Sequence, residues 1–285
     1  VGSANIHDAQ VPVYAPSPLQ PGPSARRLDS RQTSVFALDR ISLGDDWQWL
    51  AGGRFVRLDE RAYDKRGALQ RQSRLSRFLP QTALVWKAND QLNVYGSYVR
   101  GISLGQEAPF WTSNADEFLP SVQSRQLEVG VKYVPAETLT VGAALFRISQ
   151  PYQFAQPDDS EAGYTFVQQG TQTHTGLELT ANGQLTDALQ IVASASVLQA
   201  RARDAGTPAY EGHQLVNVPK VRASVHLAYA LPFVQGLQVT GGWRYASANV
   251  ARADGAVRAP DYSVFDAGLR FQHRLHERAV TWNLS

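Results

Sequence analysis

Two groups of polar side chains in the sequence are spaced closely enough to suggest metal chemistry. Asp158, Asp159 and Glu161 offer carboxylate oxygens of the kind that bind Ca²⁺, but the ligand spacing of an EF-hand loop is missing. His273 and His276 offer imidazole nitrogens that suit Zn²⁺, but both fall in a predicted turn and the chain has no cysteine. We interpret both groups as solvated side chains and expect the protein itself to bind no cofactor or metal.

The sequence also lacks the motifs of the common enzyme classes. No glycine-rich phosphate loop precedes a helix, and no G-x-S-x-G nucleophile motif occurs. A net charge of +2, with no lysine or arginine cluster, argues against nucleic acid as a partner. We therefore expect neither an enzyme nor a nucleic-acid-binding protein.

The elements that position the polar residues are predicted to be β-strands. In residues 125–146, RQLEVGVKYVPAETLTVGAALF, apolar side chains alternate with polar or small ones on both sides of a proline-containing turn. A period of two is that of a strand, so this stretch predicts a β-hairpin. Similar patterns predict about twelve strands, at residues 34–43, 47–59, 78–87, 91–100, 124–133, 138–149, 164–182, 188–200, 219–230, 236–247, 261–272 and 278–285. The long segment at 164–182 is expected to be bent or broken near Gly170.

The connections between the predicted strands alternate in length along the chain. Short turns alternate with long polar segments, at residues 60–77, 101–123, 150–163, 201–218 and 248–260. Short turns on one rim and long loops on the other are typical of an up-and-down barrel of the outer membrane. The Greek-key connections of a soluble sandwich would mix the two lengths. No stretch approaches the ~18 apolar residues of a membrane-spanning helix.

One face of the predicted strands is apolar and the other carries charges, as Leu127 and Val129 beside Glu128 illustrate. This alternation alone does not distinguish a lipid-facing surface from a soluble core. Aromatic residues of the apolar face gather at both ends of the strands: Trp86, Tyr133, Tyr229 and Phe271 at the short-turn ends, and Tyr98 and Tyr245 at the long-loop ends. The two interfaces of a bilayer select such belts, so we predict that the apolar face meets lipid. The faces of residues 35–58 are not assigned, because both contain apolar residues.

Several blocks of the sequence resemble one family. SRQLEVGVKY, LTVGAALFRISQP and GTQTHTGLELTANGQLTDALQIVASASVLQARARD, in this order and spacing, are similar to the C-terminal part of TonB-dependent siderophore receptors. YEGHQLVNVPKVRASVHLAYALP and YSVFDAGLRF continue the resemblance, which runs from about Arg31 to Ser285. Within the family, the chain looks most like the ferric-hydroxamate, ferrichrome-type branch.

The resemblance implies an all-β fold, a transmembrane antiparallel up-and-down β-barrel. This chain would supply about 12 strands of a larger, plugged barrel of about 22. We assign residues 1–30 to an extracellular loop-like segment and residues 31–285 to the C-terminal part of the barrel, without the plug domain, the Ton box and the last strand of the family. The implied location is the outer membrane of a Gram-negative bacterium. The implied partners are a ferric siderophore, outer-membrane lipid and, through the absent plug and Ton box, the TonB energy-transducing system.

Uptake by such a receptor is binding followed by gated passage, so the resemblance implies a ligand site without catalytic groups. A ferric chelate has an organic shell around a saturated metal, which aromatic surfaces and a few hydrogen-bond donors can recognise. The long loops supply the candidates Phe110, Trp111, Tyr152, Phe154 and Tyr210, with Tyr14 as a further one. Each has an alternative role in packing or at the membrane rim. Charged residues of the interior face are expected to hold the plug or to pair across the wall: Glu128, Lys132, Glu178, Arg222 and Arg270.

Other interpretations stay open on the sequence alone. The same fold can serve another cargo, such as cobalamin, haem or a glycan, because loops change faster than walls. A passive porin would lack the plug. A soluble β-sandwich or carbohydrate-binding module would instead place Leu127, Val225 and Leu269 in a sealed core, with Glu128 and Arg270 in solvent.

Overall fold

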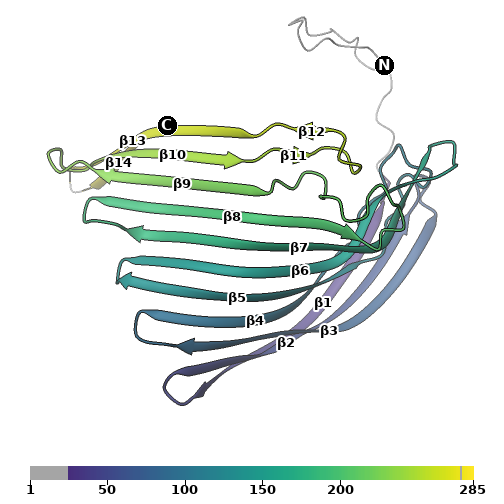
Figure 1. Cartoon of the computed structure of the whole chain (residues 1–285), viewed down its shortest axis with the longest axis horizontal. Coiled ribbons are helices and arrows are strands. Elements are labelled where there is room, and N and C mark those ends of the chain that lie inside the picture. Colours follow the sequence, from purple (N-terminus) through teal and green to yellow (C-terminus); the bar gives the residue numbers. More distant parts are fainter. Residues whose placement is uncertain (1–24, 277) are drawn as a thin grey trace, which may run out of the picture.

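The computed structural model describes residues 25–276 and 278–285. These residues form an antiparallel sheet of 12 strands, each paired with its neighbours in chain order (Figure 1). The strands of the sheet are β1 (Leu28–Leu43), β2 (Trp47–Tyr63), β3 (Leu69–Lys87), β4 (Leu92–Ser103), β5 (Val122–Ala136), β6 (Leu139–Pro157), β7 (Tyr164–Gln184), β8 (Leu189–Arg203), β9 (Val221–Ala230), β10 (Leu237–Ala246), β13 (Tyr262–Leu275) and β14 (Arg278–Leu284). A separate pair, β11 (Asn249–Val250) and β12 (Arg258–Ala259), lies between β10 and β13. Tyr14 lies outside the described residues.

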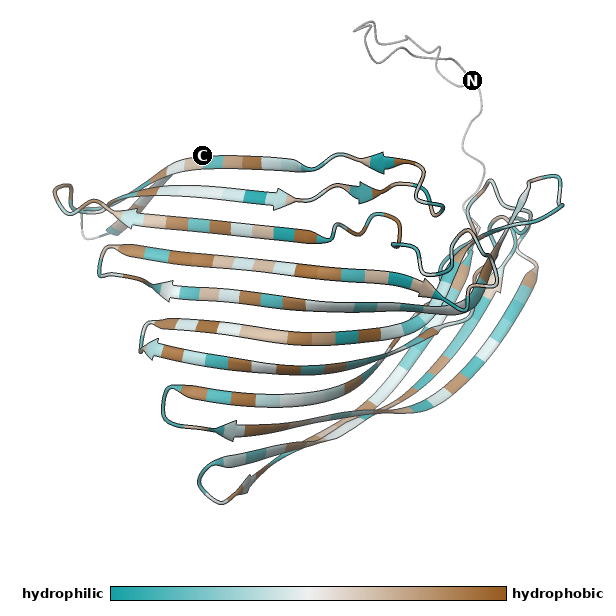
Figure 2. Cartoon of the chain, in the orientation of Figure 1, coloured by the Kyte–Doolittle hydropathy of each residue, from teal (hydrophilic) through white to brown (hydrophobic). Residues whose placement is uncertain are grey.

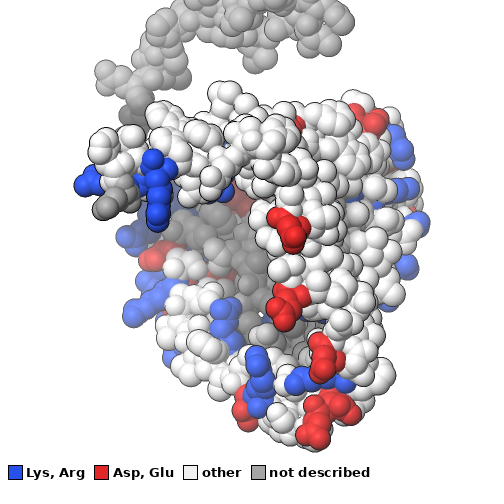
Figure 3. Space-filling model, turned by 90° about the vertical axis from the view of Figure 1, so that its left-hand side faces the viewer, with Lys and Arg blue, Asp and Glu red and all other residues white. Residues whose placement is uncertain are grey.

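The curved sheet has short turns at one end of its strands and long segments at the other, as predicted (Figure 1). The view from the short-turn end shows the hollow on the concave side (Figure 3). The short turns use residues suited to tight backbone conformations: Gly44 and Gly236 adopt positive φ angles of 70° and 82°. The Asn89 side-chain oxygen accepts hydrogen bonds from the backbone N–H groups of Gln91 and Leu92, at 2.9 and 2.8 Å. The described part of the chain contains no helix suited to crossing a membrane.

The register of the strands separates an apolar face from a polar one. One row across six strands consists of apolar residues: Val94, Val131, Ala143, Leu179, Ala195 and Ala223. The adjacent row on the other face consists of Asn93, Lys132, Gly142, Thr180, Ser194 and Ser224. Figure 2 shows this alternation as bands of brown and teal along the strands. We call the first face the outward face and the second the interior face, because the chain's loops pack on the second.

The outward face is exposed, which contradicts the soluble alternative. Leu127 is 56% exposed and Leu269 is 44% exposed, so these side chains are not sealed in a core. On the interior face, Glu128 accepts hydrogen bonds from Tyr95 Oη at 2.7 Å and from Gln126 Nε2 at 2.9 Å. The buried cluster of apolar residues lies at the long-loop end. An apolar surface of this extent along the wall is the surface that lipid requires.

The register also assigns the faces of the first two strands, which the sequence left open. Trp47 pairs with Trp86, and their rings stack with centroids 6.0 Å apart, at the short-turn end of the outward face. Phe55 pairs with Phe78 on the same face, nearer the long-loop end. The intervening residues Val56 and Leu58 point to the interior face and are buried. Two belts of outward aromatic residues are therefore present from the first hairpin onward.

Several strands extend beyond their predicted ends on the long-loop side. β2 and β3 continue to Tyr63 and from Leu69, so the predicted loop at 60–77 shrinks to a turn at 64–68. β6 continues to Pro157, so the prediction that Tyr152 and Phe154 lie on a loop was wrong. The reason is that a hairpin beyond the lipid has water near both faces and needs no alternation of apolar and polar residues.

β7 bends at Gly170, as predicted. Gly170 has a φ of 70°, and the register between β6 and β7 shifts between Pro151 and Gln153. A Cβ atom at Gly170 would meet the backbone of Arg203 and Asp204 on β8 and its following turn. The extra residue on β7 makes this a β-bulge, which turns the upper parts of β6 and β7 relative to the wall.

Candidate ligand-binding site

A cavity of about 650 Å³ opens at the long-loop end of the interior face. Five segments contribute to it: the β4–β5 connection, β6, β7, the β8–β9 connection and the β11–β12 turn. Its lining consists of Gln106, Trp111, Gln150, Tyr152, Gln153, Phe154, Ala155, Tyr164, Phe166, Gln172, His174, Tyr210, Leu215, Val216, Val218, Ala251, Arg252 and Ala253. We call it the aromatic pocket. Its size lies within the usual range for small-molecule sites of ~300–1,000 Å³.

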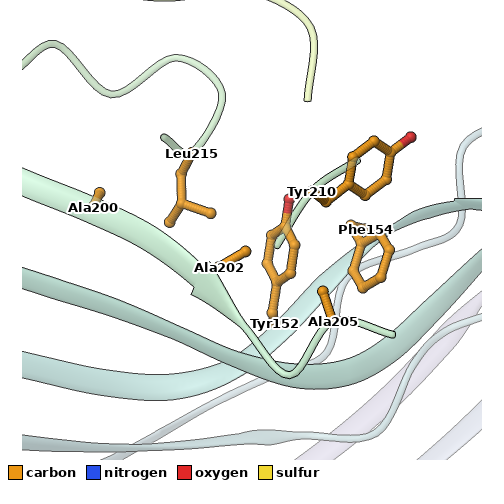
Figure 4. Close-up of a cluster of buried hydrophobic side chains, with 7 residues drawn as sticks. All are labelled: Tyr152, Phe154, Ala200, Ala202, Ala205, Tyr210 and Leu215. Atoms are coloured by element: carbon orange, nitrogen blue, oxygen red, sulfur yellow. The ribbon is translucent and has the colours of Figure 1, made fainter. Parts of the chain in front are cut away.

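The floor of the aromatic pocket is the upper end of β6. Tyr152 and Phe154 are two residues apart on this strand, so both side chains point to the same face. Their rings stack with centroids 4.6 Å apart and an interplanar angle of 14°. Tyr210 meets Phe154 edge to face, with centroids 5.6 Å apart and an angle of 80° (Figure 4). These offset and T-shaped arrangements are the favoured geometries of aromatic pairs.

Small residues at the end of β8 let the segment carrying Tyr210 pack closely. Ala200, Ala202 and Ala205 are fully or almost fully buried against Tyr152, Phe154, Tyr210 and Leu215 (Figure 4). Leu215 N–H donates to the carbonyl of Ala200 at 3.1 Å, and Gly212 N–H donates to the carbonyl of Ala202 at 2.9 Å. The Glu211 carboxylate accepts hydrogen bonds from the N–H groups of Asp204 and Ala205, at 3.1 and 3.0 Å. The segment is therefore held in place on both sides of Tyr210.

A second wall comes from the β4–β5 connection, which Asn114 attaches to β7. Asn114 Nδ2 donates to the carbonyl of Phe166 and its Oδ1 accepts from the Phe166 N–H, both at 2.9 Å. Ser113 N–H donates to the carbonyl of Tyr164 at 2.8 Å. This attachment places Trp111 edge to face with Tyr164, with ring centroids 5.6 Å apart and an angle of 86°.

The aromatic pocket is nearly neutral in charge. Arg252 is the charged residue among its lining, and it forms two short contacts with Asp254: Nε to Oδ1 at 2.8 Å and Nη2 to Oδ2 at 2.7 Å. The hydrogen bond from Arg252 keeps the pKa of the Asp254 carboxyl below its ordinary value, so the pair stays ionised and mutually neutralised. The other polar groups are amides, phenols and His174.

Burial keeps the two central phenols in their neutral form. Desolvation raises the pKa of Tyr152, and the neighbouring Tyr210 raises it further. Desolvation also raises the pKa of Tyr210, and Tyr164 and Asp254 add to the shift, while Arg252 opposes it. Both side chains therefore remain neutral groups that can donate and accept a hydrogen bond over the whole physiological pH range.

Of the five predicted site residues, four line the aromatic pocket and one does not. Trp111, Tyr152, Phe154 and Tyr210 come together, whereas Phe110 is 85% exposed and is not part of the lining. Sequence reasoning missed Tyr164, Phe166, Gln172, His174 and Arg252. Tyr164 and Phe166 lie in a predicted strand, but the bulge at Gly170 shifts their direction, and the alternation pattern does not reveal such a shift.

The polar groups first considered as metal ligands have other contacts. Asp158 Oδ1 accepts hydrogen bonds from the N–H and Oγ of Ser160, at 3.1 and 2.5 Å, and its Oδ2 accepts one from the Thr165 hydroxyl. His273 Nε2 accepts a hydrogen bond from Trp282 Nε1 at 3.0 Å. Within residues 25–276 and 278–285, no three His, Asp or Glu side chains are grouped to hold a metal ion.

The predicted interior charges lie on the interior face of the wall, below the aromatic pocket. Lys132 and Glu178 line a smaller cavity of about 230 Å³ together with Tyr95 and Glu128. Across the described strands, no salt bridge involves Glu128, Lys132, Glu178, Arg222 or Arg270. These five side chains therefore do not neutralise one another through salt bridges across the wall.

Known proteins share this fold and sequence pattern. The chain is 27% identical over 270 residues to the ferrioxamine B receptor of Salmonella typhimurium, which covers 91% of this chain and 36% of that protein. It is 24% identical over 266 residues to the ferrichrome outer membrane transporter/phage receptor of Escherichia coli K12, with 90% and 34% covered. Its fold is similar to that of BauA, the ferric preacinetobactin receptor of Acinetobacter baumannii, with a TM-score of 0.72 and 24% identity over 90% of this chain and 38% of that one.

The chain thus spans about a third of the length of these relatives. The match to a family model covers nearly all of this chain. Residues 4–285 match the β-barrel of TonB-dependent-receptor-like proteins. With the alternating rims, the exposed apolar face and the aromatic belts, this match leads to one conclusion: the chain belongs to the TonB-dependent receptor β-barrel family.

Proposed function

We propose that this chain forms the ligand-recognising part of an outer-membrane receptor that takes up ferric siderophores. Proteins of its family are transport receptors of the Gram-negative outer membrane and not enzymes. The aromatic pocket is the observation that carries the proposal. It lies at the rim opposite the short turns, on the interior face, where a ligand arriving from outside would enter the barrel.

The chemistry of the aromatic pocket suits a chelate of low net charge. A ferric siderophore has an already saturated metal, so the protein has to recognise only the organic shell. Trp111, Tyr152 and Tyr210 offer aromatic faces and phenol hydroxyls, and Gln150 and Gln172 offer amide groups. Asp254 neutralises Arg252. A ligand with several negative charges would therefore lose its hydration on binding and would find no unpaired positive charge in the pocket.

The rest of the transport system belongs to the same proposal. β1 and β14 pair with a neighbour on one side only, and lipid does not tolerate unpaired backbone groups along such edges. We infer that the wall from β1 to β14 is the C-terminal part of a larger plugged barrel. This wall begins at Leu28 and not at the predicted residue 31. Energy would come from the TonB system acting through the plug. The names of the relatives, which include receptors for ferrioxamine and ferrichrome, support this inference.

Binding of ferric chelates by the full-length receptor tests the proposal. A neutral ferric trihydroxamate should bind saturably and quench tryptophan fluorescence, and the Trp111→Ala/Tyr210→Ala variant should bind at least about tenfold more weakly, because large aromatic contacts dominate such sites. The control Phe110→Ala, on the same segment but outside the pocket, should bind like the wild type. Cobalamin and haem serve as competitors. Saturable binding of one of these and of no ferric chelate would overturn the proposal.

A further inference from the structure

The β4–β5 connection, residues 104–121, is attached to the wall on two sides. We call this connection the strap. On one side, Asn114 attaches it to β7. On the other side, basic side chains at the long-loop ends of β1 to β3 contact carboxylate and carbonyl oxygens of the strap. The strap is therefore fixed by polar contacts to two separate parts of the sheet.

Arg27, directly before β1, contacts both arms of the strap. Its Nη2 donates to Glu107 Oε1 at 3.2 Å and to the carbonyl of Asp116 at 2.9 Å. Glu107 in turn pairs with Phe118 across the strap. Lys65, in the β2–β3 turn, adds a contact of 2.6 Å from its Nζ to Asp116 Oδ2. One guanidinium group, with this lysine beside it, therefore holds the two arms against the wall.

Arg71 of β3 contacts the end of the strap and is itself held by a buried carboxyl group. Its Nη2 donates to the carbonyl of Leu119 at 3.2 Å, and its Nη1 lies 4.0 Å from Glu60 Oε2. Glu60 is 2% exposed, and Arg71 pairs with Ala62, two residues further along the same face of β2. A carboxylate buried this deeply requires a nearby cation. Glu60 therefore keeps Arg71 on the interior face, within reach of the strap.

The strap connects these contacts with the aromatic pocket, because it carries Trp111. Arg27, Glu60 and Arg71 are not among the residues that line this pocket. We propose that Arg27 and Arg71 are positioning residues for ligand recognition, which hold the strap so that Trp111 stands edge to face with Tyr164 before a ligand arrives. This inference rests on the proposed function and deepens it. A wall that is already ordered raises affinity, because binding does not have to order it.

Chelate titrations of the full-length receptor test this role. Arg27→Gln/Arg71→Gln should weaken binding of a neutral ferric trihydroxamate about three- to tenfold, because the strap then has to be ordered on binding. The same two substitutions in a Trp111→Ala background should change the affinity by no more than about twofold, because their effect passes through Trp111. Equal losses in the two backgrounds would show that the arginines act independently of Trp111 and would overturn the proposal.

Glu60→Gln/Arg71→Gln separates positioning from stability. Arg71→Gln alone leaves Glu60 buried without its cation and should lower the heat stability of the barrel. Removing both charges should restore much of that stability, because no buried charge is then left unpaired. The chelate affinity should stay as low as in Arg71→Gln, because the contact with the Leu119 carbonyl is still lost. Recovery of the affinity together with the stability would overturn the proposal.

The matched control is Arg26→Gln/Arg74→Gln, which removes two arginines from the same part of the wall. Arg26 pairs with Asp29 and Arg74 with Asp59, each at 3.0 Å, so neither ion pair involves the strap. This variant should bind the chelate like the wild type. A loss equal to that of Arg27→Gln/Arg71→Gln would contradict the role of the strap.

A measurement without ligand distinguishes this inference from the proposed function. Backbone hydrogen exchange in residues 104–121 should be about tenfold faster in Arg27→Gln/Arg71→Gln than in the wild type and in the control, because local opening becomes easier. If the wild type binds no ferric chelate while exchange still rises, the proposed function fails and the contacts of the strap stand. Unchanged exchange in a receptor that binds ferric chelates would overturn the positioning role alone.

Discussion

At the scale of single residues, Asn114 shows how one side chain can take the place of a strand. Its amide group makes the two hydrogen bonds to Phe166 that a neighbouring backbone would make. The β4–β5 connection is thereby fixed to β7 without a regular strand of its own, and Trp111 is fixed with it. A loop attached in this way loses little conformational freedom when a ligand binds.

The Arg252–Asp254 pair sets the charge of the aromatic pocket, so its removal should change ligand preference. Asp254→Asn leaves Arg252 without its neutralising partner. We expect the affinity for an anionic ferric catecholate to rise several-fold, while that for a neutral ferric hydroxamate stays within about twofold. Parallel titrations of the two chelates measure this. Asp261→Asn, an exposed neighbour outside the pocket, is the control, and an equal gain there would contradict the assignment.

The same pair predicts a pH dependence of the wild type. Arg252 lowers the pKa of Asp254, so the carboxylate remains ionised as the pH falls past the ordinary range of an Asp and protonates only below it. The preference for neutral chelates should therefore hold from neutral pH down through the pH range in which an ordinary Asp carboxyl becomes protonated. Only below the depressed pKa does the wild type acquire the unpaired cation that Asp254→Asn has at neutral pH.

At the scale of elements, the bulge at Gly170 connects the wall to the aromatic pocket. Gly170→Ala adds both backbone strain at a φ of 70° and a Cβ atom against the backbone of Arg203 and Asp204. We expect the upper ends of β6 and β7 to lose order at a cost of about 1–3 kcal/mol. Ligand affinity should fall by about tenfold or more, while the heat stability of the barrel in detergent changes little.

Gly163→Ala is the matched control for this substitution. Gly163 has a similar φ of 73°, but a Cβ atom there would meet nothing within 4 Å. It therefore carries the backbone strain without the clash. If both variants bind ligand equally well, the bulge does not position the pocket.

The sequence predicted the elements where lipid imposes a pattern on them. The band from Leu127 to Tyr133 alternates because one face meets hydrocarbon and the other the interior, and there the strands were correct. Beyond the lipid this constraint ends, so the upper parts of β2, β3 and β6 were mistaken for loops. The same gap explains why Tyr164 and Phe166 were missed, because their place in the pocket depends on the bulge.

At the scale of the whole molecule, the outward face decides where a charge is tolerated. Val129 lies midway between the Tyr133 belt and Arg125 on β5 and is 61% exposed. Val129→Arg should destabilise the folded barrel in a bilayer by about 2–4 kcal/mol. Gln123→Arg, on the same face and strand at the headgroup level, should cost no more than about 1 kcal/mol. Urea titrations in lipid vesicles measure both, and equal costs would contradict the lipid-facing assignment.

Tyr152 and Phe154 lie on a continuation of the barrel wall, and this has a consequence for recognition. Their rings are already in position before a chelate arrives, so the entropy that a mobile loop would lose, ~0.5–1.5 kcal/mol for each side chain, is not lost there. The floor should thus act as a fixed template, which rejects ligands of the wrong shape. Tolerance for variation among chelates would then come from the β11–β12 turn, which carries Arg252.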